Sequence, residues 1–288
     1  MENILELQQI CKSFPKSDFI LDKLSFSLPY GAILGFVGEN GAGKTTTIGC
    51  ILNTVRKDSG TVKLFGKEMR DTDTDIREKI GVVYDGDNFP GFWTAKQLSQ
   101  VMEGIYTQWD HALFQKYSED FHLPVKQKIK NYSRGMTMKL AIAVALSHHP
   151  QLLILDEATS GLDPIMRDEM LDVFLEFVQE ESHSILLSSH ITSDLEKVAD
   201  YITFIHNGKL ILTASKNDLV YHYAVMRCRE NQFLALDPGD IIAYRKRDFQ
   251  IDVLVDNGKE AQRKYKDAVV DHVSVDEIML LLVKGERV

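Results

Sequence analysis

The sequence has few cysteines and lacks a long apolar run. Cys11, Cys50 and Cys228 lie far apart and form neither a metal-binding spacing nor a CxxC motif, so we expect reduced thiols in a cytoplasmic protein. No apolar stretch approaches the roughly 20 residues of a membrane-spanning helix. The first residues also lack the basic and apolar regions of a signal peptide. If this protein works at a membrane, we expect another chain to supply the spanning segments.

Positive charge is also scarce. The chain has 33 Lys and Arg against 42 Asp and Glu, a net charge of −9, which argues against a broad electrostatic surface for nucleic acid. We therefore expect no nucleic-acid partner. The 288 residues are 44% hydrophobic and 26% charged, the balance of a globular protein with a full core. This length suits one large domain or a domain with a smaller one.

A glycine-rich stretch at residues 38–45 has the sequence GENGAGKT and matches the phosphate-loop pattern G-x-x-x-x-G-K-[ST]. An apolar run precedes it and a helical pattern follows, so backbone N–H groups and a helix N-terminus can surround phosphate oxygens. A glycine-rich turn with a chance lysine would not explain these flanks. We predict that Lys44 reaches the β- and γ-phosphates and that Thr45 offers its hydroxyl to Mg²⁺. The nucleotide-binding residues predicted here are Gly38, Glu39, Asn40, Gly41, Ala42, Gly43, Lys44, Thr45 and Thr46.

A second motif follows a strand pattern at residues 152–155, which ends in Asp156 and Glu157. The carboxyl end of a buried strand lies at the mouth of an α/β sheet, where ligands bind. Asp156 would hold Mg²⁺ directly or through water, and Glu157 would polarise the attacking water at the γ-phosphate. A strand with a solvated acidic turn would look the same, but the upstream phosphate loop favours the functional interpretation.

The patterns along the chain predict an α/β fold. It would have a core that carries the phosphate loop, a helical insert and a small C-terminal α+β lobe. We predict an ATP-binding domain at residues 1–215, with the helical subdomain at about 85–132, and an accessory lobe at 216–288. Residues 3–10 are expected to form an edge strand and residues 11–15 a loop. Thr94 and Asp110 are expected to cap helices, and Asn207-Gly208 to form a hairpin turn.

The segment at residues 131–136 precedes another helix. Ser133 is a good N-cap, and Gly135 permits close approach of the backbone. A helix N-terminus attracts anions, but by physics alone this is an ordinary capped helix.

In their order, these motifs resemble the ATP-binding subunit of an ATP-binding-cassette (ABC) transporter of the exporter type. The resemblance runs from residue 1 to about 215. It rests on the phosphate loop, the helical insert, residues 132–136, Asp156-Glu157, residues 160–163 and His190. It implies a P-loop NTPase core with an antiparallel β subdomain, and it implies that two such domains bind head to tail around two ATP molecules. Ser133 and the Gly135 amide would then contact the partner's γ-phosphate.

The same resemblance implies roles for three further residues. Asp163 would cross the dimer interface, and His190 would sense the γ-phosphate through a hydrogen bond. Phe14 matches the aromatic residue that stacks on adenine. A histidine at a strand end and an aromatic at the edge of a core are also common structural features.

Two positions depart from the family pattern. Asp85 stands where a glutamine usually contacts Mg²⁺ and senses the membrane subunit. A carboxylate can ligate Mg²⁺, so Asp85 is a candidate metal ligand, but it adds negative charge near the γ-phosphate. Arg134 and Met136 replace Gly and Gln of the common signature, and Arg134 could add positive charge near the phosphate or point to solvent.

The sequence therefore predicts an ATP hydrolase that drives an exporter built with separate permease chains, at the cytoplasmic side of the cell membrane. ATP and Mg²⁺ would be bound, Glu157, His190 and Lys44 would be catalytic, and a like or sibling subunit would complete the dimer. Residues 88–93 would contact the permease or pack internally. The alternative is a soluble regulatory ABC ATPase that acts on ribosomes or DNA. Intact catalytic residues argue against a subunit that only binds nucleotide.

Overall fold

The six-stranded sheet forms the centre of the molecule. The computed structural model describes residues 2–70, 72–86 and 88–287, so Met1 and Val288, the outer ends of the two predicted domains, lie outside the described residues. The strand order is β10-β9-β3-β8-β7-β6, parallel except for β10. These strands are β3 (Ile33–Val37), β6 (Ile80–Val83), β7 (Leu152–Asp156), β8 (Ser184–Ser189), β9 (Tyr201–His206) and β10 (Lys209–Ser215).

This sheet separates two apolar cores, because alternate residues of a strand point to opposite faces. Leu153 and Leu155 of β7 join the core under the large helices, whereas Leu152 and Ile154 join the core under the antiparallel sheet. Burial on both faces explains why β3 and β7 are almost continuously apolar in sequence. The helices around the sheet are α1 (Lys44–Ile51), α2 (Thr74–Arg77), α5 (Arg134–Leu146), α6 (Pro164–Phe177) and α7 (Thr192–Val198).

The antiparallel sheet corrects two expectations. Its order is β2-β1-β4-β5, with β1 (Asn3–Phe14), β2 (Ser17–Pro29), β4 (Ser59–Leu64) and β5 (Lys67–Glu68). The predicted edge strand at residues 3–10 is instead an interior strand, paired with both β2 and β4. The predicted loop at residues 11–15 is strand as far as Phe14. Alternating burial looks the same in edge and interior strands, so the pattern could not reveal the second partner.

The segment between β6 and α5 is helical in its described part. It contains α3 (Ala95–Glu103), α4 (His111–Asp120) and a 3₁₀ turn, η1 (Ile129–Asn131). Both predicted caps are confirmed. Thr94 forms a reciprocal capping box with Gln97, and the Asp110 side chain accepts a hydrogen bond from the Leu113 amide.

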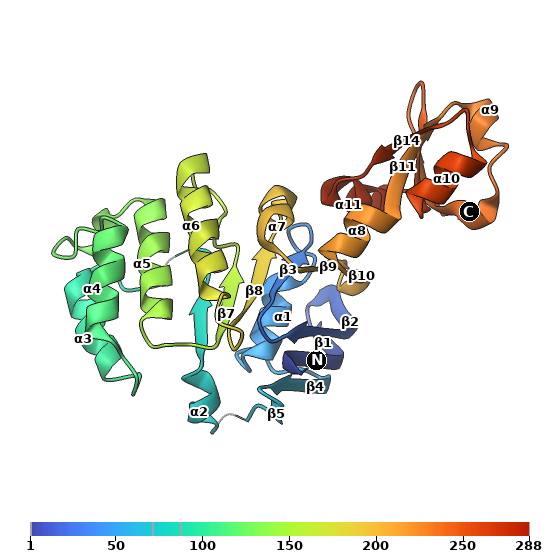
Figure 1. Ribbon diagram of the computed structural model, residues 1–288. Coiled ribbons are helices and arrows are strands. Elements are labelled where there is room, and N and C mark those ends of the chain that lie inside the picture. The colour runs from blue at the N-terminus through green and yellow to red at the C-terminus, as the bar shows by residue number, and fades with distance from the viewer. Residues whose placement is uncertain (1, 71, 87, 288) are drawn as a thin grey trace.

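The C-terminal lobe is an antiparallel sheet with helices, and it projects beside α7 at the opposite end of the molecule from the helical insert (Figure 1). Its strand order is β12-β13-β11-β14. The elements are α8 (Lys216–His222), β11 (Tyr223–Cys228), α9 (Glu230–Phe233), η2 (Pro238–Asp240), β12 (Ile241–Lys246), β13 (Ile251–Asp256), α10 (Gly258–Lys264), β14 (Val269–His272) and α11 (Val275–Lys284). The lobe therefore combines strands and helices, as the sequence predicts for this part of the chain.

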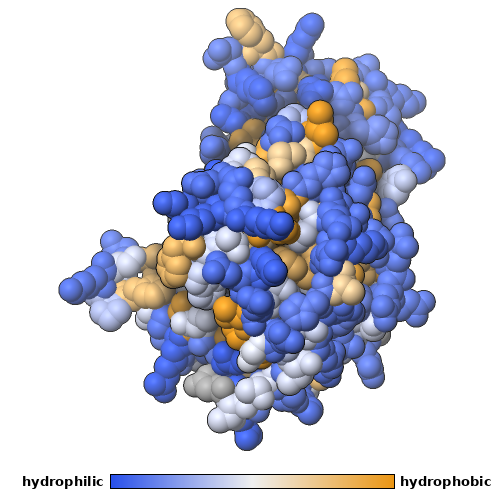
Figure 2. Space-filling view, turned by 90° about the vertical axis from the view of Figure 1, so that its left-hand side faces the viewer, coloured by the Kyte–Doolittle hydropathy of each residue, from blue (hydrophilic) through white to orange (hydrophobic). Residues whose placement is uncertain are grey.

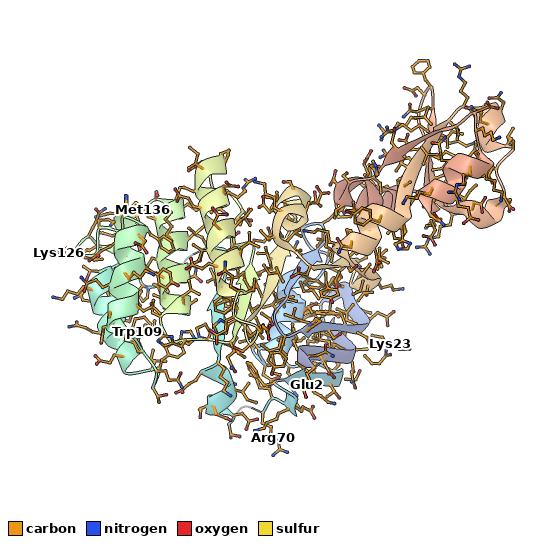
Figure 3. All side chains as sticks on the ribbon, in the orientation of Figure 1. Glu2, Lys23, Arg70, Trp109, Lys126 and Met136 are labelled. Carbon is orange, nitrogen blue, oxygen red and sulfur yellow. The ribbon has the colours of Figure 1, made fainter. Side chains whose placement is uncertain are left out.

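The outer surface is largely polar. Seen from the side of the helical insert, apolar side chains occur in small separate groups among hydrophilic ones (Figure 2). The view of all side chains shows Met136, near the start of α5, above Trp109, which belongs to the helical insert (Figure 3). Every helix in the described part of the chain is too short or too polar to cross a bilayer.

Candidate nucleotide-binding site

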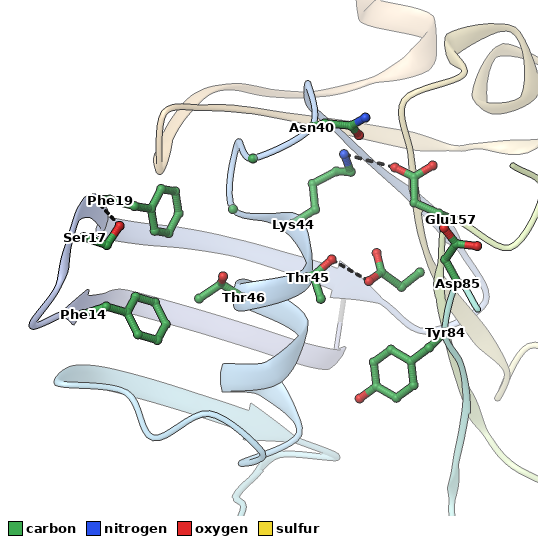
Figure 4. Close-up of a pocket in the computed structure, with 13 residues that line it drawn as sticks. Phe14, Ser17, Phe19, Asn40, Lys44, Thr45, Thr46, Tyr84, Asp85 and Glu157 are labelled. Carbon is green, nitrogen blue, oxygen red and sulfur yellow. Dashed lines mark hydrogen bonds and ion pairs between the residues drawn. The ribbon is translucent and has the colours of Figure 1, made fainter. Parts of the chain in front are cut away.

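A cavity of about 660 Å³ lies where the phosphate loop meets the carboxyl ends of β6 and β7 (Figure 4). Loops at this edge of a parallel sheet are where α/β proteins bind ligands. The cavity is lined by Phe14, Ser17, Phe19, Asn40, Gly41, Gly43, Lys44, Thr45, Thr46, Tyr84, Asp85, Asp156 and Glu157. Ten of these thirteen residues were predicted from the sequence, and they come from segments far apart in the chain.

The phosphate loop leads directly into α1 and needs glycine at Gly43. Its φ is +114°, and a Cβ atom there would lie 2.8 Å from the Phe19 ring and 2.7 Å from Leu21. Lys44 is 5% exposed. Its Nζ donates to the carbonyl oxygen of Gly38 at 2.7 Å and lies 3.1 Å from Glu157 Oε1. The ammonium group is therefore fixed at the mouth of the loop.

Thr45 and Asp156 meet at the base of the cavity. Thr45 Oγ1 donates to Asp156 Oδ2 at 2.7 Å, and Ser188 Oγ donates to Asp156 Oδ1 at 2.8 Å. The described residues contain no cluster of three or more His, Cys, Asp or Glu side chains able to hold a metal. A hydroxyl and one carboxylate suit Mg²⁺, which takes its remaining oxygen ligands from water and phosphates. The donor set therefore fits this ion.

Glu157 follows β7 and is held from two sides. Its backbone has a φ of +55° and its amide donates to the Ser188 carbonyl at 3.0 Å. His190, which follows β8, places Nδ1 2.6 Å from Glu157 Oε2. Because a carboxylate only accepts hydrogen bonds, Nδ1 carries the proton in this contact. Left-handed backbone at a non-glycine residue costs free energy and is common at functional sites.

Three cavity residues were missed in the sequence: Ser17, Phe19 and Tyr84. The β1–β2 pairing places Ser17 opposite Phe14, so the hairpin pattern was the available signal. Phe14 is 37% exposed, and two aromatic rings therefore line this end of the cavity. Burial raises the pKa of the Tyr84 phenol, against a hydrogen bond with Thr54 that lowers it, and the nearby Asp156 carboxylate raises it further.

Other predicted residues lie outside this lining. Ser133 caps α5 by accepting from the Met136 amide at 3.2 Å, and Asp163 caps α6. Gly135 packs against α6 so closely that a Cβ atom would overlap Met166. Asp85 lines the cavity, but its Oδ1 accepts a hydrogen bond from Arg134 Nη2 at 2.8 Å.

The aromatic segment at residues 88–93 is partly packed inside the molecule and partly exposed. Phe89 and Trp93 are partly buried against the helical core, whereas Phe92 is 67% exposed. A separate groove of about 400 Å³ runs between α2 and the end of α3. Tyr84 lines both this groove and the nucleotide cavity.

Comparison with known proteins gives a consistent result. The family model described as ABC transporter matches residues 21–160. The bacitracin transport ATP-binding protein BcrA of Bacillus licheniformis is 34% identical over 218 residues, covering 73% of this chain and 69% of that protein. The lantibiotic transport ATP-binding protein SrtF of Streptococcus pyogenes is 34% identical over 219 residues, covering 73% and 90%. A dimeric ATP-binding cassette bound to ADP and Pi shares the fold, with a TM-score of 0.65, 18% identity and coverage of 74% and 98%.

Proposed function

This chain belongs to the ABC transporter family as an ATP-binding subunit with ATPase activity, and on that premise we propose that it powers an exporter formed with separate permease chains. The observation that carries the proposal is the convergence of Lys44, Asp156 and Glu157 on one cavity. The similar proteins named for bacitracin and lantibiotic transport support export as the direction. The chain would then act at the cytoplasmic side of the cell membrane.

The side chains divide the chemistry between binding and hydrolysis. Lys44 would leave Glu157 and bind the β- and γ-phosphates, which places positive charge where negative charge develops. Glu157, released from Lys44, would polarise the water that attacks the γ-phosphate. With Nδ1 donating to Glu157, His190 can donate to a phosphate through Nε2 only as the imidazolium ion. The adenine would lie against Phe14 and Phe19.

Thr45 and Asp156 would hold Mg²⁺. When bound, the ion neutralises charge on the phosphate oxygens. Asp85 is a weaker candidate ligand, because Arg134 already occupies one of its oxygens.

The proposed partners are a second ATP-binding subunit and the permease. Ser133, Gly135 and Asp163 lie outside the lining of their own cavity, which supports a role toward the nucleotide of a like or sibling subunit. The groove lined by Arg77, Tyr84 and Ile105 and the neighbouring segment 88–93 are the surfaces proposed for the permease. Tyr84 would link permease contact to the nucleotide site, since it lines both.

The Glu157→Gln variant tests the catalytic role. We expect steady-state ATP hydrolysis, measured with the permease present, to fall by about 10²- to 10⁴-fold, with ATP binding retained. The control is Glu169→Gln on α6, where an exposed acid pairs with Lys139, and it should hydrolyse ATP like the parent. Equal hydrolysis by parent and Glu157→Gln would refute the catalytic assignment.

Co-purification tests the coupling to a membrane protein. The chain should be recovered with a permease of the same cell from detergent-solubilised membranes. Recovery with ribosomes or DNA instead would favour the regulatory alternative.

A further inference from the structure

The cavity carries more negative charge than a site for a polyanion needs. Among the described residues that line it, Lys44 is the one cationic side chain, whereas Asp85, Asp156 and Glu157 are carboxylates. Asp156 and Glu157 have partners and roles within the site, as described above. Asp85 has no ion pair with Lys44, and its charge would repel bound phosphates unless something compensates it.

The compensating group comes from outside the cavity. Asp85 Oδ1 and Arg134 Nη2 are 2.8 Å apart, and both side chains are about half exposed, at 47% and 54%. The two residues are 49 positions apart in sequence, and the end of β6 and the start of α5 bring them together. A charge-assisted hydrogen bond of this length favours the paired state of both groups.

The backbone of the segment before α6 also contacts the guanidinium group. Gly161 has a φ of +70°, and a Cβ atom there would lie 2.7 Å from Arg134 Cζ and Nη1. Glycine therefore leaves the space that the guanidinium occupies. Arg134 is confined between Gly161 and Asp85, which reduces the entropy lost in forming the pair.

We propose that Arg134 is a positioning residue for ATP binding in its own chain, acting through Asp85. The pair replaces the neutral glutamine expected at position 85 with a carboxylate whose charge is cancelled. Arg134 would have no direct contact with this nucleotide, and its removal would expose the Asp85 charge to the phosphates. The inference rests on the proposed function, because it requires ATP in this cavity.

The test is a double-mutant cycle on nucleotide affinity. Equilibrium binding of ATP and ADP with Mg²⁺ is measured for the full chain, Arg134→Gln, Asp85→Asn and the double variant. Arg134→Gln should weaken ATP binding by about three- to tenfold and ADP binding less, because ADP carries less negative charge. Adding Asp85→Asn should restore affinity to within about twofold of the parent. High salt should shrink the defect of Arg134→Gln, since exposed charges are screened.

A matched control is Lys197→Gln, which breaks an exposed ion pair with Asp168 at 2.7 Å and should bind ATP like the parent. The proposal would be overturned if Arg134→Gln weakened ATP binding equally in the parent and in the Asp85→Asn variant. It would also be overturned if Arg134→Gln did not weaken ATP binding. Failure of every chain, control included, to bind ATP would instead overturn the proposed function. Rescue by the second substitution cannot arise from misfolding, so it separates charge compensation from a structural role.

Discussion

Individual side chains determine how the cavity distributes its charge. Before nucleotide binds, Lys44 is paired with Glu157, and Thr45 donates to Asp156. ATP can replace Glu157 as the partner of Lys44, and Mg²⁺ can replace the hydrogen bond between Thr45 and Asp156. Neither exchange leaves a buried group unpaired. The site is therefore preorganised for a charged ligand, and single substitutions should separate its binding and catalytic parts.

Thr45→Val isolates the proposed magnesium ligand. Valine keeps the shape of threonine but lacks the hydroxyl, so the variant should lose most of the magnesium dependence of ATP binding. Removing Mg²⁺ with EDTA should weaken ATP binding to the parent on the order of tenfold or more. The same treatment should change ATP binding to the variant much less. Fluorescence titration with an ATP analogue measures both. Thr46→Val changes the next residue in the lining and should keep the magnesium dependence of the parent. Parent-like dependence in Thr45→Val would show that the hydroxyl holds no ion.

At the level of elements, the β9–β10 hairpin supports the phosphate loop. Asn207 and Gly208 have φ values of +46° and +70°, so the predicted Asn-Gly turn is confirmed. The Gly208 amide donates to the Ala42 carbonyl at 2.9 Å, and its carbonyl accepts from Asp22 at 2.8 Å. One turn therefore fixes both the phosphate loop and strand β2.

Gly208→Ala should destabilise the protein more than the backbone strain of a positive φ alone explains. A Cβ atom there would overlap the Ile20 carbonyl oxygen, whereas Gly66, with a similar φ of +76°, has nothing within 4 Å. In urea denaturation, Gly66→Ala should lower the free energy of unfolding by about 1–2 kcal/mol and Gly208→Ala by about 3 kcal/mol or more. Equal losses of unfolding free energy in the two variants would mean that a Cβ atom at position 208 does not clash with β2.

Across the whole molecule, the C-terminal lobe shares a core with the catalytic domain. Ile278 and Leu281 of α11 belong to the same apolar cluster as Leu195 of α7, and the Val275 amide donates to Glu196 Oε1 at 2.6 Å. Helix α7 begins two residues after His190. The lobe therefore packs against the element that follows the proposed phosphate sensor.

Ile278→Ala should lower the stability of the whole chain. Ile278 is fully buried, so the cavity left behind should cost about 2–5 kcal/mol. The two tryptophans, Trp93 and Trp109, belong to the helical insert by their sequence positions. The insert lies at the opposite end of the molecule from the lobe (Figure 1), so they report on a distant part of the fold. The unfolding transition followed by tryptophan fluorescence should shift to a lower urea concentration, together with the transition followed by circular dichroism.

Val269→Ala is the control for this substitution, because Val269 is 58% exposed and its truncation should change stability by less than about 0.5 kcal/mol. A tryptophan transition unaffected by Ile278→Ala, with a separate early loss of circular dichroism, would show that the lobe unfolds independently.

The sequence by itself determined the features that depend on near neighbours in the chain. The phosphate loop with its strand and helix, the caps at Thr94 and Asp110, and the Asn207-Gly208 turn each need only a few consecutive residues, and local sterics and hydrogen bonding specify them. The two acids at the end of β7, Asp156 and Glu157, were recognisable because a buried apolar strand has a definite carboxyl end.

Only the tertiary structure decided contacts between distant segments. The interior place of β1, the entry of Phe19 into the cavity and the pairing of Asp85 with Arg134 all depend on which elements lie side by side. Hydrophobic periodicity records which face of an element is buried, but not what covers it. For that reason the sequence identified Asp85 as an unusual residue, and only the fold supplied its partner.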